Sequence, residues 1–121
     1  MDLETILWTC QGILAGMFTM AGMFKVLNPK EKLAEKMAWV EDYQESTIKM
    51  IGAAEFIGAL GLIVPAMTNI LPILTPIAAI GLGLIMILAS ATHAKRNEYK
   101  EVVINVVLMV MAATVAYGRL M

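Results

Sequence analysis

The residues best suited to chemistry are few, and each lies near the end of a long apolar run. Glu55 lies about eight residues inside such a run, roughly 12 Å below a membrane surface if the run is a spanning helix. A carboxylate facing hydrocarbon at that depth would cost several kcal/mol. We therefore expect Glu55 to face the other helices of the bundle, to be neutral, or to be paired with a cation.

Three other polar residues occupy similar positions in their own apolar runs. Lys25 closes the first run, His93 closes the third, and Asn105 lies about three residues into the fourth. If these ends meet on one side of a bundle, one polar group from each helix converges on a common site. Residues that share faces with them complete a predicted ligand-binding set of Glu55, His93, Lys25, Asn105, Gln11, Phe18 and Met86.

Each of these residues also has a purely structural interpretation. Lys25 is close enough to its helix end to extend toward lipid headgroups, and His93 can interact with the dipole at a helix C-terminus. Asn105 and Gln11 can form hydrogen bonds between helices. Glu55 can form a structural ion pair with Lys25 or a hydrogen bond with His93. Both interpretations therefore remain open from the sequence.

The chain carries none of the familiar catalytic or metal-binding patterns. There is no nucleophile elbow and no glycine-rich phosphate loop. Cys10 and His93 are its only cysteine and histidine, so the sequence offers no intrachain disulfide, no metal-ligand cluster and no clear haem ligation. The net charge of −1 and the lack of a basic stripe argue against a nucleic-acid partner. We predict no catalytic residue and no metal, and a protein that does not act as an enzyme on its own.

Composition places these residues in a membrane protein. Of the 121 residues, 60% are hydrophobic and 16% are charged, which is too apolar for an ordinary soluble domain. About 20 apolar residues are needed to cross the hydrocarbon core as a helix. The apolar runs predict one all-α domain over residues 1–121, an integral membrane four-helix bundle with spans at about residues 4–27, 47–65, 75–93 and 102–118.

Prolines set two of these boundaries. The second span is expected to stop at Pro65, because proline has no backbone N–H and interrupts a helix. The third span has two possible starts, Asn69 or Thr75-Pro76. The later start is favoured, because Thr75 can then be the N-cap and Pro76 can take the first helical position.

Between the first two spans, apolar residues such as Leu33 and Val40 oppose charged ones such as Lys32 and Glu35. This pattern predicts a short amphipathic helix over about residues 29–44 that lies at the membrane interface, or else a solvated helical linker. Lysine and arginine gather in this loop and in the one between spans three and four, whereas Arg119 is alone on the other side. The positive-inside rule then predicts that both termini are non-cytoplasmic.

Several motifs together resemble the DoxX-like family of small four-helix membrane proteins. The resemblance covers nearly the whole chain and combines glycines at set spacing with the glutamate, histidine and lysine described above. The residues that carry it are Ala21 to Lys25, Gly52 to Leu62 with Pro65, Leu74 to Leu82, Met86, Ala89, Thr92 and His93, Asn105, and Gly118 with Arg119.

We expect an integral protein of the cytoplasmic membrane of a bacterium or archaeon. The resemblance points to a functionally diverse family. Family members are associated with quinone-linked sulfur oxidation, oxidative-stress complexes and resistance to quinones or catechols, and a eukaryotic relative acts as a receptor-assembly chaperone. The bundle is also similar to that of sterol isomerases, in which acidic residues engage the ligand. Glu55 would match such a residue, but only one buried acid is evident here, which speaks against a two-group isomerase mechanism.

The leading hypothesis is an accessory or redox-associated membrane protein whose bundle holds a small apolar ligand, such as a quinone or lipid. Glu55 and His93 would contact the polar end of that ligand. The alternative is a non-catalytic interaction subunit or assembly factor in which Glu55 is structural. An isomerase or oxidoreductase using Glu55 and His93 is less favoured, and a channel or transporter less still. Expected partners are membrane lipid, the apolar ligand, and a second copy or a membrane redox protein.

Overall fold

The computed structural model describes residues 1–121, which form helices joined by short turns and contain no strand. Four of the helices are long and apolar enough to cross a membrane. The predicted all-α membrane helical bundle is thus confirmed. The helices in chain order are α1 (Leu3–Leu27), α2 (Lys30–Ala34), the 3₁₀ helix η1 (Ala38–Asp42), α3 (Glu45–Thr68), α4 (Leu74–Lys95) and α5 (Tyr99–Leu120).

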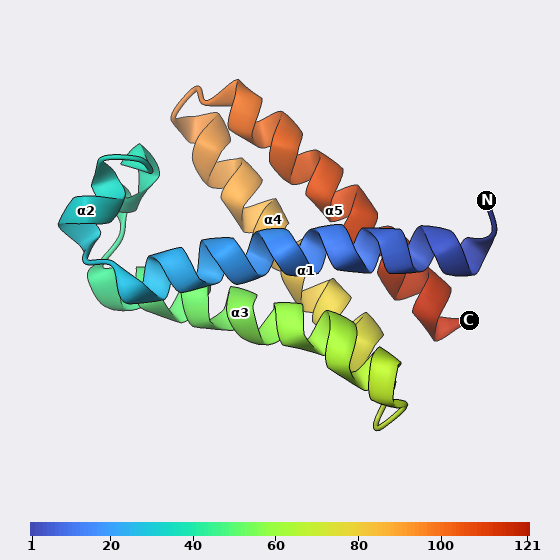
Figure 1. The fold of residues 1–121 in the computed structure, drawn as a ribbon. Coiled ribbons are helices and arrows are strands. Elements are labelled where there is room, and N and C mark those ends of the chain that lie inside the picture. Colours follow the sequence, from blue (N-terminus) through green and yellow to red (C-terminus); the bar gives the residue numbers. More distant parts are fainter.

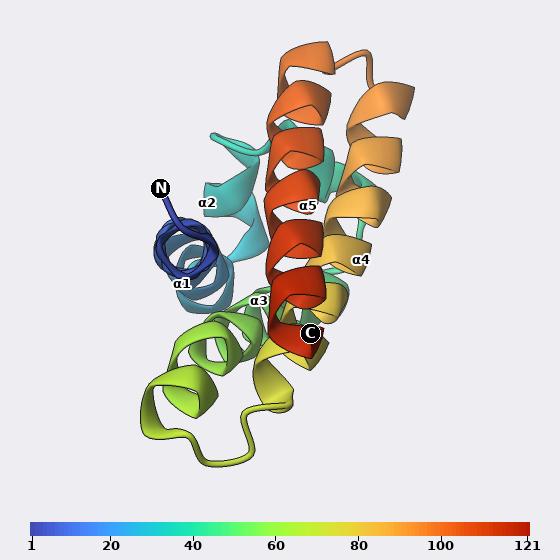
Figure 2. The same cartoon turned by 90° about the vertical axis from the view of Figure 1, so that its right-hand side faces the viewer.

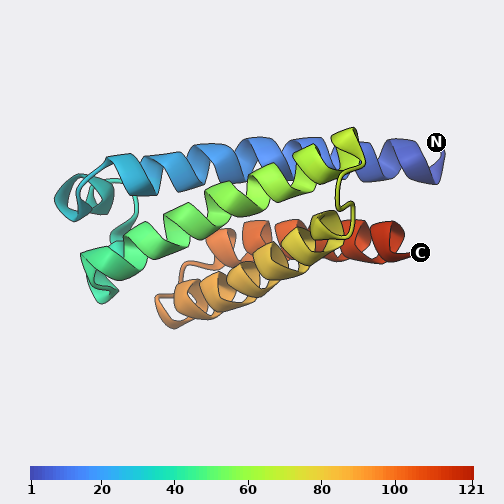
Figure 3. The same cartoon turned by 90° about the horizontal axis from the view of Figure 1, so that it is seen from below.

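The long helices form two antiparallel pairs, α1 with α3 and α4 with α5 (Figure 1). The pairs cross near the end that holds both chain termini, and they diverge toward the opposite end, where α2 and η1 lie (Figures 1 and 3). Figure 2 shows the same crossing with α1 viewed nearly along its axis. The main core fills the crossing and includes Leu14, Phe18, Leu62, Leu82 and Val115.

Glycines bring α1 and α3 into close contact. A Cβ added to Gly22 would lie 2.5 Å from the carbonyl oxygen of Gly52, and one added to Gly52 would lie 2.8 Å from the carbonyl oxygen of Gly22. Small residues allow this kind of approach between membrane helices. The contact lies one helical turn from both Lys25 and Glu55, so it sets the separation between the backbones that carry them.

The outer surface of the bundle is apolar. Only 24 of the 121 residues are buried, and large exposed hydrophobic side chains, such as Ile57, Leu88 and Val107, stand on the outer faces of the long helices. A soluble domain would seldom leave so continuous an apolar surface in water. These faces suit contact with acyl chains.

Pro65 does not end the second span as expected, because α3 continues through it to Thr68. A proline leaves the carbonyl four residues earlier without its helical donor. That carbonyl belongs to Gly61, and the hydroxyl of Thr75 donates to it across the helix interface at 2.9 Å. Thr75 is not the N-cap of α4, because that helix begins at Leu74 with Ile73 as its N-cap and without a side-chain cap.

The segment expected to be one interfacial helix over residues 29–44 is instead broken into α2 and η1. Met37 leaves the helical conformation, with φ −129° and ψ 81°. Leu33 and Val40 are both fully buried and form a small cluster with Ile48. The chain turns at Met37, which lets both side chains reach α3.

Candidate ligand cavity

A cavity of about 740 Å³ lies between the two helix pairs on the side where they diverge. Its volume is within the range of sites that hold small molecules, about 300 to 1,000 Å³. Fifteen of its 25 lining residues are hydrophobic, so most of the wall suits an apolar ligand. All four long helices and the segment around η1 contribute to it.

Six of the seven residues expected at a ligand site line this cavity: Phe18, Lys25, Glu55, Met86, His93 and Asn105. The convergence follows from topology, because one end of the bundle contains the end of α1, the first half of α3, the end of α4 and the start of α5. This is the end at which the two helix pairs diverge. Their polar groups gather toward that side, while Phe18 and Met86 belong to the buried core.

Gln11 is the exception and lies outside the cavity. Its side-chain amide is fully buried, donates to the carbonyl of Leu62 at 2.6 Å, and accepts from the Nε of Arg119 at 2.8 Å. Gln11 therefore joins α1 to α3 and α5 near the termini, which is the structural alternative for this residue.

Glu55 forms an ion pair with Lys25, with 2.5 Å between Oε1 and the lysine Nζ. The side chains are only 3% and 8% exposed, so the pair is almost fully removed from solvent and lipid. The second carboxylate oxygen, Oε2, has no hydrogen-bond partner within the chain. One acceptor on the cavity wall is therefore free to meet a ligand.

Asn105 supplies the matching donor. The residue is 9% exposed, and its Nδ2 is fully buried without a hydrogen-bond partner. A buried polar group without a partner costs roughly 1 to 3 kcal/mol, and such groups in folded proteins usually have one. Asn105 also lines the cavity, and rotation of its amide group would turn this donor toward a ligand oxygen.

His93 pairs with Glu98 rather than with Glu55. Its Nδ1 lies 2.7 Å from Oε1 of Glu98. Because a carboxylate only accepts, Nδ1 carries the proton in this contact, and Nε2 has no partner within the chain. His93 thus presents its second ring nitrogen as a further polar group at the cavity.

The segment around η1 covers the diverging end of the cavity. Trp39 meets the ring of His93 edge to face at 6.3 Å between centroids, and the Nζ of Lys25 lies 5.8 Å from the Trp39 ring. The hydroxyls of Tyr43 and Thr92 lie 2.6 Å apart.

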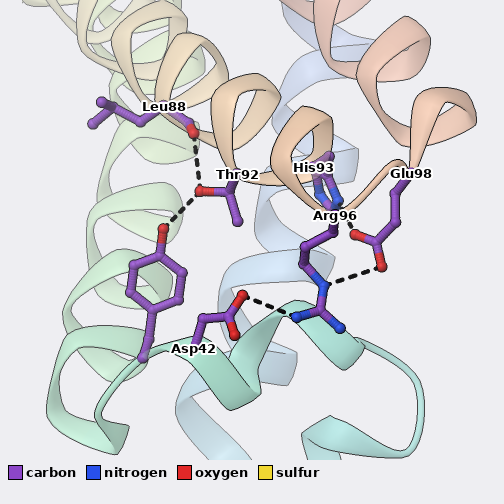
Figure 4. Close-up of polar contacts among 7 residues, drawn as sticks. Asp42, Leu88, Thr92, His93, Arg96 and Glu98 are labelled. Atoms are coloured by element: carbon purple, nitrogen blue, oxygen red, sulfur yellow. Dashed lines mark hydrogen bonds and ion pairs between the residues drawn. The ribbon is translucent and has the colours of Figure 1, made fainter.

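A second set of contacts joins η1 to the turn between α4 and α5. Arg96 donates to Asp42 at 2.9 Å and also contacts Glu98, as Figure 4 shows. Trp39 and Tyr43 were not among the expected site residues. In the sequence, only their aromatic side chains, in a segment that also carries charged residues, indicate that Trp39 and Tyr43 could lie at a site.

The hydrogen bond from His93 holds the pKa of the Glu98 carboxyl below its ordinary value, and Arg96 adds to this effect. A carboxyl whose pKa is lowered by folding stabilises the fold above the ordinary glutamate pKa of about 4.3, and this contribution is lost as pH falls through the lower folded value. When the pH is lowered below about 4.3, we expect the melting temperature of the detergent-solubilised protein to drop less for Glu98→Gln than for the wild type. Glu101→Gln, the matched control, should keep the wild-type drop, and an unchanged drop in Glu98→Gln would contradict this assignment.

The family is settled by comparison of the sequence with family models. Residues 9–115 match the model of the DoxX-like family. The chain belongs to the DoxX-like family. No curated protein and no solved structure matches it.

In this member of the DoxX-like family, the polar side chains at the cavity are hydrogen-bonding groups. No group of three or more histidine, cysteine, aspartate or glutamate side chains is placed to hold a metal ion. What the cavity presents is an acceptor on Glu55, a donor on Asn105 and a ring nitrogen on His93, next to an apolar wall. This arrangement can orient one polar end of an otherwise apolar molecule.

Proposed function

We propose that this DoxX-like membrane protein is an accessory, redox-associated subunit that holds a small apolar ligand, a quinone or lipid, in its cavity. The observation that carries the proposal is Asn105, a residue that lines a mostly apolar cavity and whose buried Nδ2 has no partner in the chain. A ligand oxygen would complete its hydrogen bonding.

Glu55 and Lys25 suit the end of the ligand head group opposite the one that meets Asn105. The free Oε2 of Glu55 accepts from a ligand hydroxyl, while Lys25 keeps the glutamate charge balanced. A quinone offers carbonyl acceptors, which fit the Asn105 donor alone. Its reduced form offers hydroxyl groups, which can donate to Glu55 and accept from Asn105, so the reduced form fits both groups. Phe18 and Met86 provide aromatic and thioether surface for the ring.

Substitution of Asn105 by leucine tests this function. Protein purified in mild detergent from its native membrane should retain quinone or lipid close to one per chain, measured by mass spectrometry of a solvent extract. Asn105→Leu should retain about fivefold less, since it loses one hydrogen bond of about 1 kcal/mol. Val107→Leu, a lipid-facing neighbour, serves as the control. A wild-type extract without stoichiometric ligand, or equal retention by Asn105→Leu and the control, would rule the proposal out.

A second candidate function is a non-catalytic interaction subunit or assembly factor. The complete ion pair between Lys25 and Glu55 favours it, because Glu55 already has a structural partner. This candidate predicts a stable partner protein in pull-downs from mild detergent, and the partner should remain bound to Asn105→Leu. No hydrogen bond joins Glu55 to His93, and nothing observed favours an isomerase or oxidoreductase built on these two residues.

We also propose that the η1 end faces the cytoplasm of a bacterium or archaeon and that both termini lie on the other side of the membrane. The termini share one end of the bundle, and most lysines and arginines lie at the opposite end.

A further inference from the structure

A second hollow of about 650 Å³ lies on the outside of α1 and touches the cavity. It is formed by residues of α1 and by Lys36, which follows α2. Met17, Ala21 and Lys36 line both spaces, so the two meet at these residues. The lining residues of the hollow are Met17, Met20, Ala21, Met23, Phe24, Leu27, Asn28 and Lys36.

Helical spacing shows which flank of α1 carries this hollow. The buried face of α1 includes Phe18, Gly22 and Lys25, and α3 meets this helix at Gly22 and Val26. At 3.6 residues per turn, Met17 and Ala21 lie beside the buried face on the flank opposite Val26. Met17 and Ala21 line the cavity together with Ile104 of α5, so this flank borders the space between α1 and α5.

The hollow opens to the membrane. Met20 and Leu27 are 74% and 70% exposed, so the outer part of the hollow faces acyl chains. Two other sides of the cavity are closed. The core at the helix crossing blocks the end near the termini, and the Tyr43–Thr92 contact, with Trp39, covers the side between α3 and α4.

We infer that the ligand of the cavity carries a long apolar tail, which leaves the bundle between α1 and α5 across Ala21 and lies along the methionine-rich hollow. This inference rests on the proposed function and adds the shape of the ligand to it. Met17 and Leu27 are separated by roughly 15 Å along the helix, enough for an extended tail. The flexible methionines suit a prenyl or an acyl chain equally well.

A bulky residue at the opening tests the path of the tail. Two probes are compared, a benzoquinone head group without a tail and the same head group with a decyl tail. Binding is followed by quenching of Trp39 fluorescence in a Trp8→Phe background. Ala21→Phe should weaken binding of the decyl probe about tenfold or more and leave the tailless probe within about twofold. Ala113→Phe, which adds the same bulk on an exposed face of α5, should leave both unchanged.

The outcomes separate the two proposals. If the wild type binds neither probe, a quinone as the ligand in the proposed function fails. If Ala21→Phe binds both probes like the wild type, the tail path is wrong and the cavity ligand stands. Mass spectrometry of the ligand retained from native membranes distinguishes an isoprenoid quinone from an acyl lipid.

A proximity measurement decides the case in which Ala21→Phe weakens both probes. A decyl tail ending in bromine should quench a tryptophan placed in the hollow by Met20→Trp more than one placed on α3 by Leu60→Trp, with Trp8 and Trp39 both replaced by phenylalanine. Stronger quenching at position 20 supports the path, and equal quenching at the two positions overturns it.

Discussion

Replacing Lys25 by methionine is expected to lower the free energy of unfolding by about 3 kcal/mol or more. The substitution leaves the Glu55 carboxylate almost fully buried without its cation. Breaking a buried ion pair from one side is costly because the remaining charge has neither solvent nor a partner. Reversible unfolding in detergent, followed by circular dichroism, measures the loss.

The double variant Lys25→Met with Glu55→Leu gives the matched comparison. Replacing a buried pair by apolar residues of similar size is often neutral or even stabilising, so most of the loss should be recovered. Asp42→Ala removes an exposed partner of Arg96 and should cost less than about 1 kcal/mol. A double variant as unstable as Lys25→Met would show that the buried charge is not the cause. If the double variant folds but retains no ligand, the pair has a binding role beyond structure.

Gly22→Ala is expected to destabilise the bundle by roughly 1 to 3 kcal/mol, the usual range for an overpacked core. The new methyl carbon would lie 2.5 Å from the carbonyl oxygen of Gly52 and 2.9 Å from the backbone nitrogen of Phe56. Backbone atoms cannot rotate away as a side chain can, so α1 and α3 would have to separate. The same unfolding assay measures the effect, and weaker retention of the cavity ligand should accompany it.

Gly12→Ala is the control for this effect. An added Cβ at Gly12 has no neighbour within 4 Å, and alanine is favoured over glycine in helices by up to about 1 kcal/mol. Gly12→Ala should therefore be neutral or slightly stabilising. Equal losses in both variants would mean that helix flexibility, and not the close contact at Gly22, explains the result.

The sequence predicted the fold class and the polar end of the cavity because hydrocarbon penalises polar residues strongly. Glu55 had to face protein once its run was taken as a spanning helix. The same site was predicted to include Lys25, His93 and Asn105, because they lie at the ends of neighbouring apolar runs. A four-span topology brings these ends to one side of the membrane. The structure places all four on the wall of one cavity.

Features that depend on contacts between distant residues could not be predicted in this way. A rule about Pro65 alone says that a helix stops there, and only the position of the Thr75 hydroxyl shows how it continues. The period of Leu33, Met37 and Val40 indicates one helix, whereas the chain leaves the helical conformation at Met37 and packs Leu33 and Val40 against Ile48. Gln11 shares the face of Phe18 on α1, but its partners Leu62 and Arg119 lie far along the chain.

The hydrogen bond from Thr75 to Gly61 places a pivot at one end of α4, because it joins that helix to α3 where the two meet closely. Along the axis of α4, Thr92 lies roughly 26 Å from Thr75. A tilt of about 5° at the pivot would move the far end by roughly 2 Å, whereas the same tilt would barely disturb the crossing. Tyr43 contacts Thr92, and Asp42 contacts Arg96, at the C-terminal end of α4. At this end a small change of helix tilt has its largest effect on the width of the cavity.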